Sequence, residues 1–243
     1  MPLTAAHLDA ALTQADQEGL SHLAFLHRVI ADQAQLRRER STQQRIKEAH
    51  FREQKTLASF DWNFNAKAIN RVQIEELATG DFIRRRQNLV LVGQSGVGKT
   101  FLVQAIGLSA CTLGYRVRYI TSAHLLRDLT ASLADQTLPK RVRYYAHFEA
   151  LIIDEFGFER IERLESPQAA SLFYKIIDAR SQQGSTVLVT NIDFEAWGDY
   201  LGDPPLAMAF LDRVVENAII LKIPGRSYRA HRAGGPEPEN PPE

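Results

Sequence analysis

A glycine-rich loop that ends in a lysine and a hydroxyl is the part of this sequence best suited to chemistry. The pattern G-x-x-x-x-G-K-[ST] is matched by Gly93-Gln94-Ser95-Gly96-Val97-Gly98-Lys99-Thr100. Glycines at these positions let backbone amides close around phosphates, and a helix that begins at the lysine adds the positive end of its dipole. We expect Lys99 to reach the β- and γ-phosphates and the Thr100 hydroxyl to ligate Mg²⁺.

The flanking segments support this interpretation. Residues 88–92 form a short apolar, β-branched run typical of a buried strand, and residues 99–110 have apolar residues at helical spacing. A glycine-rich turn that binds nothing would not need the lysine, the hydroxyl and both flanking elements. The segment therefore predicts a nucleoside triphosphate site. The expected contacts are Gly93, Gln94, Ser95, Gly96, Val97, Gly98, Lys99, Thr100 and Phe101.

Two adjacent acids end a second apolar run. Leu151–Ile153 is followed directly by Asp154 and Glu155. Asp154, at the carboxyl end of a strand, is placed to hold Mg²⁺ beside Thr100. Glu155 is placed to orient and polarise the attacking water as a general base. This pairing argues against a GTPase, because GTPases position that water with a glutamine.

Asn191 is the next candidate, because it follows the apolar run 187–190. A polar residue there can lie between the acidic pair and the γ-phosphate and hydrogen-bond the attacking water. An isolated asparagine at a strand end is more often a turn former, so this assignment depends on its context.

Arg213 lies on a helical segment just before the last apolar run. It is too distant along the chain to serve the loop of its own subunit, so we expect it to stabilise transition-state charge in a neighbouring subunit's site. The alternative is a helix-surface ion pair with Asp212 or Glu216.

The best candidate for nucleic-acid contact is a short basic segment with aromatic residues. It contains Lys140, Arg141, Arg143 and Tyr144. Cationic side chains supply phosphate contacts, and tyrosines supply stacking or hydrogen bonds. The alternative is an amphipathic helix whose tyrosines are buried. A second basic cluster, Arg84–Arg86, is more typical of a solvated turn. No segment resembles a helix-turn-helix reader, so we expect binding that does not depend on DNA sequence.

Apolar runs and helical patterns alternate through the rest of the chain. The expected strands are 88–92, 116–120, 150–154, 186–190 and 218–222, and the expected helices include 69–78, 99–110, 123–134 and 167–182. Such alternation predicts an α/β fold with a parallel sheet and helices on both faces.

The two ends of the chain differ from this region. Residues 1–60 predict a helical appendage with a solvated basic helix that extends through Lys55, which could also contact a partner or DNA. Residues 61–230 form the predicted nucleotide domain. Residues 231–243 are rich in proline and acidic residues and predict a disordered tail.

Composition limits the class of protein. The chain has 243 residues, 44% of them hydrophobic, and a formal net charge of zero. Its one cysteine, Cys111, excludes an intramolecular disulfide and fits buried packing. The sequence has no signal-peptide pattern and no run long enough to span a bilayer. We expect a soluble, cytoplasmic protein with no membrane association.

Together these residues resemble the AAA+ ATPases. The resemblance makes 93–100 the Walker A motif, 151–155 the Walker B motif, Asn191 sensor 1 and Arg213 a trans arginine finger. More narrowly, the chain resembles the IstB-type ATP-binding proteins of insertion sequences, which share a subfamily with the DnaC helicase loaders. Further matching segments are 76–81, 114–118, 195–198, 202–204, 211–213 and 225–229. Residues 156–161 depart from the family's usual sequence after the acidic pair. The resemblance covers roughly residues 60–230, and the helical N-terminus is also similar in layout.

The resemblance implies a P-loop AAA+ fold with a five-stranded sheet and no full C-terminal lid, because few residues follow Ile220. Arg226 or Arg229 could then reach a phosphate in place of a lid arginine. It further implies ATP and Mg²⁺ as cofactors, assembly of a homo-oligomer on DNA, and stimulation of a transposase.

Three other functions remain. A helicase loader would share the ATPase core. A metabolic P-loop kinase would need lid arginines and a substrate pocket that the sequence does not indicate. A scaffold that binds ATP without turnover would not need Glu155.

Overall fold

The computed structural model describes residues 4–158, 168–232 and 234, and the chain divides into two compact units. Unit 1 comprises residues 1–45 and unit 2 residues 46–243. The sequence predicted the appendage to end at residue 60, whereas the division falls after Arg45. Of the predicted tail, residues 233 and 235–243 lie outside the described residues. Among the described residues, no helix has the length and apolar content to cross a membrane.

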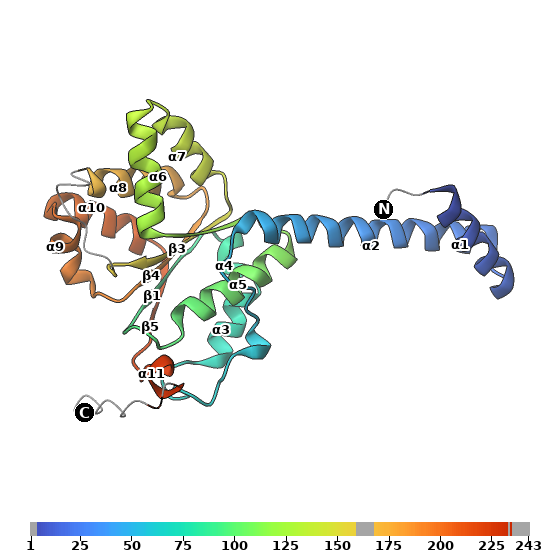
Figure 1. The fold of residues 1–243 in the computed structure, drawn as a ribbon, viewed down its shortest axis with the longest axis horizontal. Helices are drawn as coiled ribbons and strands as arrows, with labels where there is room; N and C mark the ends of the chain where they lie inside the picture. The colour runs from blue at the N-terminus through green and yellow to red at the C-terminus, as the bar shows by residue number, and fades with distance from the viewer. Residues whose placement is uncertain (1–3, 159–167, 233, 235–243) are drawn as a thin grey trace. The chain divides into compact units, whose positions relative to one another are not determined.

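Unit 1 contains α1 (Ala5–Glu18) and most of α2 (His22–Ala49) (Figure 1). The Thr4 side chain accepts a hydrogen bond from the His7 amide at the start of α1, and Gly19 ends the helix in a left-handed conformation. An ion pair of 2.6 Å joins Glu18 to Arg28. The exposed apolar side chains of this unit are Leu12, Leu23, Leu26, Ile30 and Leu36.

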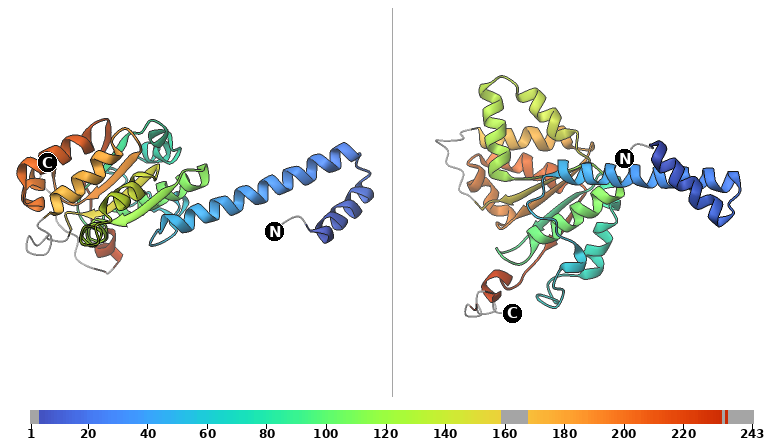
Figure 2. Two further views of the ribbon diagram at one scale, coloured as in Figure 1. Left: turned by 90° about the horizontal axis from the view of Figure 1, so that it is seen from above. Right: turned by 45° about the vertical axis from the view of Figure 1, so that its right-hand side comes forward.

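A five-stranded parallel sheet forms the centre of unit 2 (Figures 1 and 2). Its strand order is β2-β3-β4-β1-β5. The strands are β1 (Asn88–Val92), β2 (Val117–Thr121), β3 (Ala150–Phe156), β4 (Ser185–Thr190) and β5 (Ala218–Lys222). The predicted strands are thus confirmed, with bounds that differ by at most two residues. Parallel pairing places the carboxyl ends of all five strands at one edge of the sheet.

Both faces of the three central strands, β3, β4 and β1, are buried, which explains why these strands are mainly apolar, whereas most of the edge strand β5 is only partly buried or exposed. Val90, Leu151 and Leu188 lie in one hydrophobic core, and their neighbours Leu89 and Ile152 lie in the other. The first core is covered by α6 (Ser122–Ala134), α7 (Leu138–Ala146), α8 (Ala169–Arg180), α9 (Trp197–Leu201) and α10 (Pro204–Val215). The second is covered by α3 (Arg71–Ala78), α4 (Asp81–Arg84) and α5 (Lys99–Leu113). Cys111 is buried on α5, as predicted.

The basic helix predicted to run through Lys55 is shorter than expected, and its last charges are not simply solvated. Helix α2 ends at the fully buried Ala49, and His50 has a left-handed backbone with a φ of 56°. The chain leaves the helix here because Phe51 and the residues near the short 3₁₀ helix Leu57–Ser59 pack against the second core. Arg52 forms an ion pair with Glu155.

The described residues that follow β5 form a short helix. After β5, the described chain contains α11 (Tyr228–Arg232) and no further helix up to Gly234. A second 3₁₀ turn, Phe194–Ala196, follows β4.

A buried arginine joins α7 to the start of β4. Arg180 is 1% exposed, and its guanidinium donates to the carbonyls of Tyr145 (2.7 Å), Phe148 (2.8 Å) and Ser185 (2.6 Å). It also donates to the Thr186 hydroxyl at 3.1 Å. Burial lowers the pKa of Arg180 to about 9, so the guanidinium is still charged at neutral pH.

Candidate active site

The glycine-rich loop connects β1 to α5, and its glycines are required by close contacts. A Cβ atom on Gly93 would lie 2.4 Å from the carbonyl oxygen of Ile223, so no larger residue fits there. Gly98 has a φ of 104°, which favours glycine, and it begins α5 without a side-chain cap. The first amides of α5 therefore have no side-chain partner from the capping residue and are suited to bind an anion.

Lys99 lies inside this loop. Its side chain is 8% exposed, and its ammonium donates to the carbonyls of Gly93 (2.6 Å) and Gln94 (2.8 Å). Burial lowers the pKa of Lys99 to about 8, and the positive charge of Arg229 acts in the same direction. A nearby phosphate would favour the charged form of this lysine.

Asp154 lies at the carboxyl end of β3 and is 1% exposed. One carboxylate oxygen accepts a hydrogen bond of 2.7 Å from the Tyr119 hydroxyl, and the other accepts one of 2.8 Å from the amide of Glu155. Burial, and then the charge of Asp154, raise the pKa of Tyr119, so this hydroxyl remains a donor. These bonds fix the orientation of the carboxylate.

Glu155 has a strained backbone with a φ of 60°. The strain accompanies an irregularity in the pairing of β3 with β4, between Ile153 and Phe156. The Ser122 hydroxyl donates to the Glu155 carbonyl at 3.0 Å. Arg52 donates to both oxygens of the Glu155 carboxylate, at 2.7 and 3.0 Å. The sequence pattern did not predict this pair, because the two residues are 103 positions apart.

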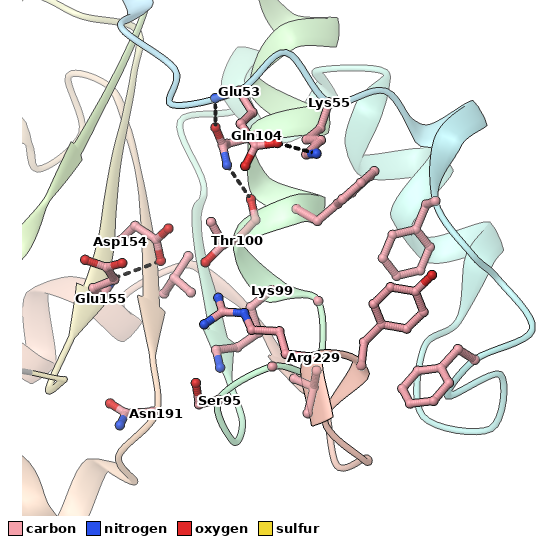
Figure 3. Close-up of a pocket in the computed structure, with 18 of the residues that line it drawn as sticks. Glu53, Lys55, Ser95, Lys99, Thr100, Gln104, Asp154, Glu155, Asn191 and Arg229 are labelled. Carbon is pink, nitrogen blue, oxygen red and sulfur yellow. Dashed lines mark hydrogen bonds and ion pairs between the residues drawn. The ribbon is translucent and has the colours of Figure 1, made fainter. Parts of the chain in front are cut away.

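One cavity of about 490 Å³ brings most of the predicted residues together (Figure 3). Asp154, Glu155 and Asn191 line it from the ends of β3 and β4, across from Lys99 and Thr100. The loop residues Ser95, Gly96, Val97 and Gly98 and the helix residue Phe101 also line it. Gly93 and Gln94 are not in its wall, but their carbonyls hold Lys99.

Part of the cavity wall is aromatic, which was not predicted. Phe60, Phe64 and Tyr228 line it together with Phe101. The ring centroids of Phe60 and Phe101 are 5.2 Å apart, and those of Phe64 and Tyr228 are 5.0 Å apart. A cavity lined by a glycine-rich loop and by aromatic rings suits a nucleotide, with its phosphates at the loop and its base against the rings.

The C-terminal segment closes one side of this cavity. The Tyr228 amide donates to the Gly96 carbonyl at 2.9 Å. Of the two arginines considered as phosphate contacts, Arg229 lines the cavity, whereas Arg226 has its guanidinium carbon 5.6 Å from the Phe64 ring centroid. Arg232 also lines the cavity.

Arg213 does not line the cavity of its own subunit. It lies at the end of α10, and its carbonyl accepts a hydrogen bond from Asn88 at the start of β1, whereas the glycine-rich loop follows the end of that strand. Its side chain is 43% exposed and pairs with Asp178 at 3.4 Å and Glu216 at 3.6 Å. A hydrogen bond with Tyr174 is the main cause of the raised pKa of Arg213.

The four residues predicted to contact nucleic acid lie on α7, outside the cavity wall. Lys140, Arg143 and Tyr144 are exposed, whereas Arg141 pairs with Asp128 at 3.2 Å. The next residue, Tyr145, is buried, its ring centroid is 5.1 Å from that of Tyr144, and its hydroxyl donates to Asp128. One tyrosine of this helix is therefore part of the core and the other is accessible.

Comparison with known proteins identifies the family. The model of the IstB-like ATP binding protein family matches residues 2–234, almost the whole chain. The chain belongs to this family. It is 34% identical over 223 residues to the insertion sequence IS21 ATP-binding protein of Pseudomonas aeruginosa, over 92% of this chain and 82% of that protein. It is 33% identical to the IS232 ATP-binding protein of Bacillus thuringiensis subsp. berliner, over 93% of this chain and 88% of that protein.

Solved structures with the same fold include DnaI and the replication initiator DnaA. The IstB-like chain matches DnaI with a TM-score of 0.57 and 22% identity, over 70% of this chain and 90% of DnaI. It matches the replication initiator DnaA, bound to AMPPCP and single-stranded DNA, with a TM-score of 0.54 and 19% identity. The match covers 72% of this chain and 51% of the DnaA chain. At this level of identity the likeness shows the fold alone, which is the predicted P-loop AAA+ fold.

The lowered pKa of Lys99 gives a pH-dependent test of the IstB-like site. Lys99 is charged below about pH 8, and a bound phosphate raises its pKa further, so ATP binding takes up a proton above pH 8. We expect the affinity for ATP to fall about tenfold between pH 7 and pH 9, measured by titration with a fluorescent ATP analogue. Lys99→Ala should bind weakly at both pH values. If the wild-type affinity is the same at pH 7 and pH 9, Lys99 does not contact the phosphates.

Proposed function

We propose that this IstB-like protein is an ATPase that assembles on DNA with ATP bound and recruits or stimulates the transposase of its insertion sequence. The observation that carries the proposal is the single cavity that Lys99, Thr100, Asp154, Glu155 and Asn191 share in a chain of an ATP-binding family. ATP is the substrate expected there. Its phosphates would contact Lys99 and the first amides of α5, and its base would pack against the aromatic residues of the cavity wall.

Thr100 and Asp154 fit a magnesium ion. Mg²⁺ in nucleotide sites takes few protein oxygens and completes its shell with phosphate oxygens and water. One hydroxyl and one buried carboxylate on the wall of the same cavity are such a set. When bound, the ion would neutralise charge on the β- and γ-phosphates. Tyr119 holds the orientation of the Asp154 carboxylate.

Glu155 and Asn191 are the proposed hydrolytic residues. A carboxylate within hydrogen-bond reach of a water can accept its proton as the water attacks the γ-phosphate. Asn191, from the end of the neighbouring strand, lines the cavity beside Glu155 and can hold the same water by its amide.

Replacing Glu155 separates binding from hydrolysis. Glu155→Gln should bind ATP normally but turn it over about 10²–10⁴-fold more slowly, the usual effect of losing a general base. It should therefore prolong the DNA-bound assembly. Phosphate release and native gels measure the two effects. Glu149→Gln, at the opposite end of β3, is the control and should hydrolyse ATP normally. If Glu155→Gln turns over ATP at the wild-type rate, Glu155 is not the base.

Arg213 is the residue that we propose a second subunit supplies to the ATP site of its neighbour. It is accessible, it lies away from the cavity of its own chain, and its ion pairs with Asp178 and Glu216 are half exposed and therefore weak. An arginine offered to a neighbour's γ-phosphate lowers the barrier in that neighbour's site. A homo-oligomer is then required for full activity.

A mixing experiment tests Arg213. Arg213→Ala should bind ATP normally and lose about 10³-fold in DNA-stimulated hydrolysis. Mixing it with Lys99→Ala should restore part of the activity, because an intact loop and an intact arginine then meet at some interfaces. Asp178→Ala is the matched control: it breaks the surface ion pair but keeps the arginine, so it should remain active. Two results together would favour the ion pair as the role of Arg213. Mixing would restore no ATPase activity, and Arg213→Ala and Asp178→Ala would lower the stability of the protein to a similar extent.

Helix α7 is the proposed DNA surface. Its accessible cations, Lys140 and Arg143, and the accessible ring of Tyr144 suit contacts to phosphates and to bases. Arg141 would contribute once it leaves Asp128. These contacts do not read base edges, so binding should be similar on unrelated sequences.

The proposed DNA surface on α7 is tested by comparing DNA binding of variants of α7 with that of variants of the basic part of α2. Removing the charges of Lys140, Arg141 and Arg143 together should weaken ATP-dependent DNA binding on any sequence. Each lost phosphate contact should reduce the log–log salt slope by about 0.9 on duplex DNA. Basal ATPase activity should be unchanged. A triple variant of Arg37, Arg38 and Arg40, exposed on α2, is the matched control. If only the α2 variant loses DNA binding, the DNA surface is in unit 1.

A replicative helicase loader is the alternative function. The likeness to DnaI is one of fold, whereas the relatives of about one-third identity over nine-tenths of the chain are insertion-sequence proteins. We therefore favour the transposase as partner. The neighbouring gene decides between the two, because an adjacent transposase reading frame favours our choice.

A further inference from the structure

Arg52 and Glu155 form a two-pronged ion pair that the proposed reaction does not use. The two outer nitrogens of the guanidinium each donate to one oxygen of the carboxylate, at 2.7 and 3.0 Å. The hydrogen bond with Glu155 is the main cause of the raised pKa of Arg52. Both oxygens of the proposed base are therefore engaged by a charged donor rather than directed at a water.

Residues on both sides of Arg52 contact α5, so the position of Arg52 near Glu155 is fixed by packing. The Phe51 ring lies against α5, where a Cβ atom on Gly107 would come within 2.8 Å of it. The Glu53 amide donates to the Gln104 side chain at 3.0 Å. Lys55 lies over the Phe101 ring, 5.4 Å from its centroid. Three residues of the segment thus contact α5 and hold Arg52 over the end of β3.

The strained backbone of Glu155 favours the same arrangement. Its φ of 60° is held by the hydrogen bond from Ser122 to its carbonyl and by the bond from its own amide to Asp154. The backbone of Glu155 is thereby held by β3 and α6, and Arg52 reaches its carboxylate from a third segment of the chain. The pair can open by motion of the Arg52 side chain without any change in β3.

We propose that Arg52 is a positioning residue that restrains Glu155 from activating water until the pair is broken. The inference rests on the proposed function, in which Glu155 is the general base. A base needs a lone pair directed at the water it deprotonates, and the guanidinium occupies both oxygens that could supply one. Arg52 follows the end of α2 by three residues, so a partner that moves the end of α2 also changes the restraint.

The size of the restraint follows from its exposure. The side chains of Arg52 and Glu155 are 48% and 35% exposed, so solvent weakens the pair. Pairs of this kind shift an equilibrium by about two- to fivefold. The restraint therefore lowers the rate of ATP hydrolysis without DNA by a small factor, which assembly on DNA can overcome.

Kinetics of Arg52 variants test the proposal in the full chain. Without DNA, Arg52→Ala should raise kcat for ATP hydrolysis about two- to fivefold and leave KM unchanged. Arg52→Lys should be intermediate, because an ammonium cannot span both oxygens. With DNA, wild type and Arg52→Ala should reach the same rate, so the factor of stimulation falls. Arg84→Ala removes an exposed arginine that pairs with Asp81, outside the cavity wall, and should change nothing.

A double variant shows whether Arg52 acts through Glu155. Arg52→Ala combined with Glu155→Gln should be as slow as Glu155→Gln alone. If Glu155→Gln is slow but neither Arg52→Ala nor Arg52→Lys raises basal kcat, the restraint is refuted and the proposed function stands. If Glu155→Gln hydrolyses ATP at the wild-type rate, the proposed base fails and this inference fails with it. A raised kcat accompanied by a changed KM would mean that Arg52 affects nucleotide binding, and would overturn the proposal.

Discussion

Parallel pairing of β3, β4 and β1 is the constraint on which the rest of unit 2 depends. Because the three strands run in one direction, the segments that follow them emerge at the same edge of the sheet. The glycine-rich loop follows β1, the acidic pair ends β3, and Asn191 follows β4. Groups separated by about a hundred residues along the chain meet in one cavity for this reason alone. The buried apolar strands keep the register, since a slip by one residue would exchange the residues of the two cores.

The second core sets the other side of the cavity. Residues 46–62 pack against α5, the helix that begins with Lys99. The segment that contains Arg52 and the helix that begins with Lys99 therefore belong to one core. The C-terminal segment joins them through the bond from Tyr228 to Gly96. The end of α2 and the carboxyl end of β3 are thus linked through one core and through the Arg52–Glu155 ion pair.

Local patterns predicted the parts of this structure that local physics determines. The runs at 88–92 and 218–222 have the bounds predicted for them, because short apolar β-branched segments favour buried strands. Asp154, Glu155, Asn191 and most of the loop line one cavity, and their types and spacing were enough to predict that they lie close together. Tyr119 and Arg52 could not be found in this way, since their partners are set by strand order and by a non-helical segment that only long-range packing defines. The end of α2 was missed for the same reason: the burial of Phe51 outweighs the helical pattern of the charges.

Arg180 limits which segments of this protein can be exchanged with those of its relatives in a chimera. Its guanidinium holds carbonyls at the end of α7 and at the start of β4, two elements that are otherwise connected only through β3 and α8. A chimera that exchanged α7 alone would have to reproduce those backbone positions, or leave buried acceptors without donors. The interchangeable block is therefore the whole span from α7 to the start of β4. Changes in the helix that we propose for DNA contact are consequently expected to be inherited together with the strand that leads to Asn191.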